Sequence, residues 1–158
     1  MNLRLVIISG GQTGADRAAL DWALRNDLPH GGWCPKGRVA SDGPLDECYR
    51  LKETPTDDLL QRTEWNVKDS DATVVFTLAP KALGGSAKAL SYAKKYRRPS
   101  LHLHQGMLAV AEKLAAFLAV NAYRRLNVAG SQESEEPGIY DWVLRSLDKT
   151  KSVMDREV

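Results

Sequence analysis

Short apolar runs rich in β-branched residues alternate along the chain with longer segments in which apolar residues recur at helical spacing. The short runs are typical of buried parallel strands, and the longer segments are typical of helices that bury one face. We expect strands at 3–9, 72–78, 99–104 and 125–129, with short strand candidates at 29–37 and 49–54. We expect helices at 13–26, 57–69, 84–97, 107–121 and 137–147, the second of them capped by Thr56. This alternation predicts an α/β fold with an open, mostly parallel sheet and helices on both faces.

Length and composition are typical of one globular domain. A chain of 158 residues can bury about 68–70% of its unfolded surface. We expect a single ligand-binding domain over 1–148 and a charged, frayed tail over 149–158. The sequence has no apolar run long enough for a membrane helix, and we expect no signal peptide. Its net charge of +2 does not indicate a nucleic-acid surface. Its two cysteines do not make a disulfide framework, so we expect reduced thiols in the cytoplasm.

The glycine-rich segment 9–17, SGGQTGADR, joins the first expected strand to the first expected helix. Unpaired N–H groups and the positive end of the helix dipole meet at such a junction, and glycine lets a ligand approach the backbone closely. The segment therefore predicts an anion site, with phosphate as the best candidate. The alternative is a tight turn that only packs well. The segment is neither a P-loop nor a complete dinucleotide fingerprint.

Two later segments repeat this arrangement. Gly84, Gly85 and Ser86 follow the strand at 72–78 and open a helix, so they could hold the same ligand from a second side. The alternative is a helix start after a flexible loop. The segment 127–134, NVAGSQES, again runs from a strand into a polar loop, although a turn with a helix cap is the favoured interpretation there.

Other polar residues give weaker signals. Lys36 and Arg38 lie in a glycine-containing loop, where they could meet an anion or simply be solvated. Asp16 could complement the helix dipole or act chemically. The three histidines and two cysteines lack the spacing of a metal site, so we expect no metal bound directly by the protein.

With these motifs in place, the chain resembles the molybdenum carrier family, which belongs with Rossmann-like proteins that bind nucleotide-type ligands. The wider group includes lysine-decarboxylase-like proteins and phosphoribohydrolases. The matching segments are 9–14, 16–21, 31–38, 42–43, 53–55, 62–66, 69–73, 84–85, 127–130, 133–134 and 137–139. Two positions depart from the family pattern: Ser131-Gln132 stand where Pro-Arg is expected, and Ser86 stands where Thr is expected.

The resemblance implies a Rossmann-like fold and a protein that binds molybdenum cofactor, a pterin phosphate that itself holds the metal. The residues expected to contact this cofactor are Gly10, Gly11, Gln12, Thr13, Gly14, Arg17, Lys36, Arg38, Gly84, Gly85, Ser86 and Gly130. It also implies a homo-oligomer, with molybdoenzymes or cofactor-synthesis proteins as partners.

Two other classes of function stay open. The chain could be a nucleotide-processing enzyme that hydrolyses an N-glycosidic bond, with Asp16 or Glu64 as acid or base. It could also be a nucleotide-sensing domain. The phosphoribohydrolases carry a glutamate in the segment that corresponds to 83–91, and this chain has none there. That difference favours a carrier without catalysis.

Overall fold

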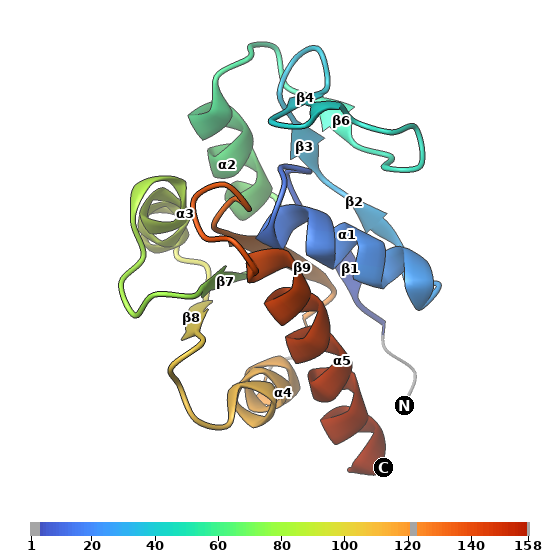
Figure 1. Ribbon diagram of the computed structural model, residues 1–158, viewed down its shortest axis with the longest axis vertical. Coiled ribbons are helices and arrows are strands. Elements are labelled where there is room, and N and C mark those ends of the chain that lie inside the picture. The colour runs from blue at the N-terminus through green and yellow to red at the C-terminus, as the bar shows by residue number, and fades with distance from the viewer. Residues whose placement is uncertain (1–3, 121–122, 158) are drawn as a thin grey trace.

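A five-stranded sheet forms the centre of the protein, and all of its strand pairs are parallel (Figure 1). The computed structural model describes residues 4–120 and 123–157. The strands of this sheet are β1 (Val6–Ile8), β2 (His30–Gly31), β7 (Ala72–Thr77), β8 (Ser100–His104) and β9 (Arg125–Gly130). They lie in the order β2-β1-β9-β7-β8.

Helices cover both faces of the sheet. They are α1 (Ala15–Arg25), α2 (Leu59–Lys68), α3 (Gly84–Lys95), α4 (Val110–Val120) and α5 (Ile139–Arg156). Helices α1, α5 and α4 lie side by side on one face, and α2 and α3 lie together on the other (Figure 1). The expected α/β, Rossmann-like fold with a parallel sheet is therefore confirmed.

The central strand β7 shows why both faces must be covered. All six of its residues are buried, as expected for a strand packed on both sides. Its side chains alternate, so Val74 and Phe76 join the core under α1, α4 and α5, while Val75 joins the core under α2 and α3. This strand supplies the rigid base from which the loop to α3 starts.

Two small sheets lie outside the central one. β3 (Trp33–Cys34) pairs in parallel with β6 (Lys52–Glu53), and β4 (Val39–Ala40) pairs with β5 (Gly43–Pro44) as a short hairpin. The expected strand at 29–37 is thus divided between two sheets, and the glycine-containing loop that holds Lys36 and Arg38 leads into a short hairpin. Gly32 lies between β2 and β3, and its φ of 127° favours glycine at this break.

Two expectations about helix ends are wrong. Asp58, not Thr56, caps α2 by accepting a hydrogen bond from the Leu60 amide at 2.9 Å. The expected frayed tail is helical as far as Arg156, because Val153 and Met154 pack against α4. Asn121, the expected last residue of the fourth helix, lies outside the described residues. None of the described helices is long and apolar enough to span a membrane.

The packing of the last turns of α5 makes a testable prediction. Met154 is 5% exposed, so Met154→Ala should lower the free energy of unfolding by about 2 kcal/mol. The control Lys149→Ala replaces an exposed residue of the same helix and should change it by less than about 0.5 kcal/mol. Chemical denaturation of both variants measures the difference. Equal stabilities would contradict a packed C-terminal helix.

Candidate functional site

The strand order creates a point where the chain connections diverge. β1 leads through α1 to β2 on one side, whereas β7 leads through α3 to β8 on the other, and β9 lies between β1 and β7. In open parallel sheets, ligands bind beyond the carboxyl ends of the strands at such a point. The loops that follow β1, β7 and β9 therefore mark the candidate site.

These loops and α2 surround one cleft with a volume of about 260 Å³. The sequence-predicted site residues that line it are Gly10, Gln12, Asp16, Gly85, Ser86 and Gly130. The other lining residues are Leu59, Leu60, Arg62, Thr63, Asn66, Asn127, Ala129, Gln132 and Glu135. The sequence predicted ligand contacts in the three loops but named none of the α2 residues of this wall as contacts.

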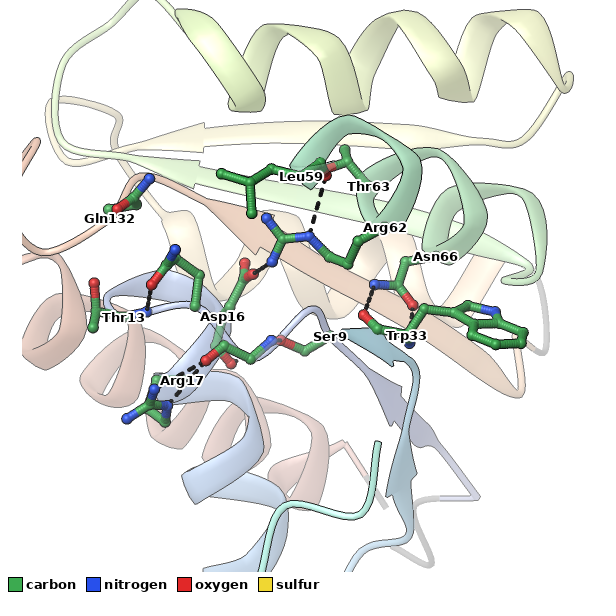
Figure 2. Close-up of polar contacts among 12 residues, drawn as sticks. Ser9, Thr13, Asp16, Arg17, Trp33, Leu59, Arg62, Thr63, Asn66 and Gln132 are labelled. Atoms are coloured by element: carbon green, nitrogen blue, oxygen red, sulfur yellow. Dashed lines mark hydrogen bonds and ion pairs between the residues drawn. The ribbon is translucent and has the colours of Figure 1, made fainter. Parts of the chain in front are cut away.

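A buried ion pair between Arg62 and Asp16 crosses the cleft. Arg62 Nη1 lies 3.2 Å from Asp16 Oδ2, and each residue is 8% exposed. Figure 2 shows Arg62 reaching from α2 toward Asp16 on α1. Burial raises the pKa of Asp16 to about 6, although the Arg62 guanidinium lowers it. The cleft therefore holds a carboxyl group that can change its protonation near neutral pH.

Asn66 fixes the helix that carries Arg62. Its Oδ1 accepts from the Trp33 amide at 2.7 Å, and its Nδ2 donates to the Trp33 carbonyl at 2.9 Å. Residues four apart lie on the same face of a helix, so this double contact also orients Arg62 one turn earlier. The pairing of Arg62 with Asn66 at this spacing is the sequence signal that could have located the wall.

Two glycines of the first loop let other parts of the protein approach the loop backbone closely. A Cβ on Gly10 would lie 2.3 Å from Arg62 Nη1, so only glycine leaves room for the guanidinium. Gly14 has a φ of 85°, and a Cβ there would lie 2.3 Å from the Ser131 carbonyl oxygen. That carbonyl accepts a hydrogen bond from the Ala15 amide at 3.1 Å. Gly14 therefore brings the loops after β1 and β9 into contact.

Gln12 connects the first loop to the β4–β5 hairpin through hydrogen bonds. Its Oε1 accepts from the amides of Thr13 and Ser41, at 3.0 and 2.8 Å. Thr13 and Gly14 themselves face a separate hollow beside Tyr49. The first loop thus presents Gly10 and Gln12, but not Thr13 or Gly14, to the cleft.

The start of α3 is exposed at Gly84 and Gly85, and Gly85 lines the cleft. Its cap residue, Leu83, makes no capping hydrogen bond through its side chain. A Cβ built on Gly84 or Gly85 would meet no atom within 4 Å. Ser86, by contrast, is 5% exposed. The first turn of α3 therefore leaves its backbone accessible at Gly84 and Gly85, where the helix carries a partial positive charge.

Glu136 ties the third loop to the second. Its carboxylate accepts from the Leu78 and Ala79 amides, both at 2.8 Å, and from the Ser131 hydroxyl at 2.6 Å. Burial raises the pKa of Glu136, but these hydrogen bonds outweigh it and leave the pKa below its ordinary value. Gly130 permits this approach, because a Cβ there would lie 2.1 Å from the Phe76 carbonyl oxygen. Ser131, a departure from the family pattern, therefore has a positioning role.

Three predicted cations lie outside the cleft lining. Arg17 donates to the Gly11 carbonyl and forms an ion pair with Asp42 at 2.9 Å, on the other side of α1. Arg38 donates to backbone carbonyls of the segment 46–51, and Lys36 is exposed. Across residues 4–120 and 123–157, Arg62 is the only cationic side chain that lines the cleft.

The two candidate acid–base residues are separated. Glu64 accepts from Lys95 Nζ and from the Tyr96 hydroxyl, each at 2.8 Å, and does not line the cleft. Asp16 does line it. Within the described part of the chain, no three His, Cys, Asp or Glu side chains are grouped so that they could hold a metal ion.

Comparison with known proteins agrees with this α/β architecture. A family model, the circularly permuted YpsA SLOG family, matches residues 7–151, and the chain belongs to this family. It is 40% identical to a protein of Syntrophus aciditrophicus SB whose crystal structure is known. The match covers 92% of this chain and 93% of that one, with a TM-score of 0.86. That protein is named a putative molybdenum carrier protein, which confirms the expected resemblance. Among curated proteins, none matches the chain.

The raised pKa of Asp16 predicts how stability depends on pH. In the folded protein, Asp16 holds its proton more tightly than in the unfolded chain, where its pKa has the ordinary value of 3.8. The stability that this difference supplies is therefore fully present below about pH 3.8. It is lost as the pH rises through about 6. Between about pH 4.5 and 7.5, the wild type should lose about 2 kcal/mol relative to Asp16→Asn, which lacks the titrating group. Denaturation curves at several pH values test this. Parallel pH profiles of the two proteins would contradict it.

Proposed function

We propose that the protein binds a small phosphorylated ligand with a heterocyclic ring in the cleft, and that this ligand is molybdenum cofactor. The observation that carries the proposal is the meeting of three strand-to-helix loops, the start of α3 and Arg62 around one cavity. The similar structure named for a molybdenum carrier supports this choice of ligand. The metal would be cargo held by the cofactor, and the protein would hold the pterin and its phosphate without catalysis.

The phosphate fits best at the start of α3. Gly84 and Gly85 leave the backbone uncovered there, and the helix supplies amide donors and a partial positive charge. The Ser86 hydroxyl follows in the first turn. Gly10 and Gln12 approach the ligand from the loop after β1, and Gly130 from β9. Contacts from Arg17, Lys36 and Arg38 are not needed in this arrangement.

The family resemblance also indicates where the protein acts, how it assembles and which partners it has. We expect a cytoplasmic homo-oligomer that passes its ligand to molybdoenzymes or receives it from cofactor-synthesis proteins. These expectations rest on the family resemblance and not on the cleft.

The substitution Gly85→Asp tests the phosphate position. An aspartate early in a helix favours folding through the dipole, and replacing glycine adds helix propensity, so thermal stability should be unchanged or higher. A carboxylate at the phosphate position should nevertheless weaken binding of neopterin monophosphate by at least about tenfold. Isothermal titration calorimetry measures the affinity.

The matched control is Ala116→Glu, which makes the same charge change at an exposed position of α4. Its affinity should equal that of the wild type. If Gly85→Asp binds as tightly as this control, the phosphate does not lie at the start of α3.

The identity of the ligand is tested on protein purified gently from its source. Native mass spectrometry should find about one pterin per subunit with molybdenum, and oxidation should release a fluorescent pterin. A nucleotide bound in its place would contradict the cofactor assignment.

One observation favours a second function. Asp16 is a cleft carboxyl with a pKa raised to about 6, which suits a general acid or base in a nucleotide-processing enzyme. Glu64 lies outside the cleft lining and does not suit this role. Release of free base from a bound nucleotide, abolished by Asp16→Asn, would establish the second function.

A further inference from the structure

In the cleft, Asp16 and Arg62 place a hydrogen-bond acceptor beside a donor. Arg62 Nη1 donates to Asp16 Oδ2, and Arg62 Nε donates to the Leu59 carbonyl at 3.4 Å. Among residues 4–120 and 123–157, no acceptor bonds to Arg62 Nη2. A carboxylate has about four lone-pair positions, so Asp16 can also accept further donors. Both groups can therefore bind a ligand while they stay paired with each other.

The charges of this pair favour a neutral partner. Arg62 offsets the charge of Asp16, so the ion pair has no strong attraction for a cation. Burial has removed much of the water that would otherwise solvate the carboxylate, and this raises its pKa. A ligand that brings N–H donors to Asp16 and an acceptor to Arg62 would replace those lost hydrogen bonds.

The walls beside the pair suit a flat ring. Leu59 and Leu60 line the cleft and are 42% and 38% exposed, which is high for leucine. Ala129 on β9 lines the cleft as well. Figure 2 shows Leu59 beside the Arg62 guanidinium, so a ring that lies against these apolar groups can present its edge to Asp16 and Arg62.

We propose that Asp16 and Arg62 read the 2-amino-4-oxopyrimidine edge of a ring, the edge that pterin and guanine share. This edge carries a carbonyl oxygen followed by a ring N–H and an amino group. Arg62 Nη2 donates to the carbonyl, and the Asp16 carboxylate accepts from both nitrogens. Adenine reverses the order, because its amino group would face Arg62 and its ring acceptor would face Asp16. The inference rests on the proposed function, since the phosphate at Gly85 fixes the other end of the ligand.

Nucleotides that differ only at this edge test the inference. Calorimetry should show that GMP binds roughly ten- to a hundredfold more tightly than IMP, which lacks the amino group. XMP, with a carbonyl facing Asp16, and AMP should bind more weakly than GMP. Asp16→Asn should reduce the ratio of GMP to IMP affinity to within about threefold of unity, because its amide adds a donor where an acceptor is needed.

Two further variants separate recognition from folding. Asp21→Asn makes the same change on α1, where Asp21 accepts from the hydroxyls of Tyr49 and Tyr140 outside the cleft, and the wild-type ratio should be kept. Arg62→Lys should weaken GMP and IMP alike and leave their ratio unchanged, since both carry the carbonyl.

The outcomes distinguish this inference from the proposed function. Equal binding of GMP and IMP to the wild type, or a preference for GMP that survives Asp16→Asn, would overturn the inference. If neopterin monophosphate still binds and stays sensitive to Gly85→Asp, the proposed function stands without it. If neither the nucleotides nor neopterin monophosphate bind, both are overturned.

Discussion

The buried ion pair between Arg62 and Asp16 is the contact on which the cleft depends. The two residues are 46 positions apart in the chain, and their side chains join α2 on one face of the sheet to the start of α1. Removing Arg62 would leave the buried Asp16 carboxylate without its counter-charge, which costs far more than a surface pair contributes. The pair also explains Gly10, because any larger residue would occupy the space of the guanidinium.

The remaining supports hold the loops around this pair. Asn66 anchors α2 to Trp33, Gly14 lets the loop after β9 approach α1, and Glu136 joins that loop to the one after β7. Each of these contacts satisfies backbone groups at the ends of strands, where the sheet no longer does so. At the start of α3, Gly84 and Gly85 instead leave the backbone uncovered, and this is why we propose an anion at that end of the cleft.

Much of the fold follows from local patterns, because strand and helix periods are properties of neighbouring residues. The apolar runs located β7, β8 and β9, and the alternation predicted the parallel sheet. The sequence did not predict the helical end of α5, because charged residues surround Val153 and Met154 in the chain. These two residues lie on the packed face of the helix.

The site was only partly predictable. Adjacent helix residues point about 100° apart, so Asp16 faces the cleft while Arg17 turns to Asp42. The pairing of Arg62 with Asp16 could not be predicted from neighbouring residues, because the two are 46 positions apart in the chain. Ligand contacts at Gly10, Gln12, Gly85, Ser86 and Gly130 stay predictions.

Backbone amide chemical shifts, followed by NMR as neopterin monophosphate is added, test the central claim most directly. If the ligand lies in the cleft, the amide signals of Gly10, Gly85 and Ser86 shift together and saturate at one ligand per chain. The signals of Arg38 and of Lys149 on α5 stay in place. Shifts centred on α4 and α5, or on the hollow beside Tyr49, with Gly85 unchanged, would contradict the account.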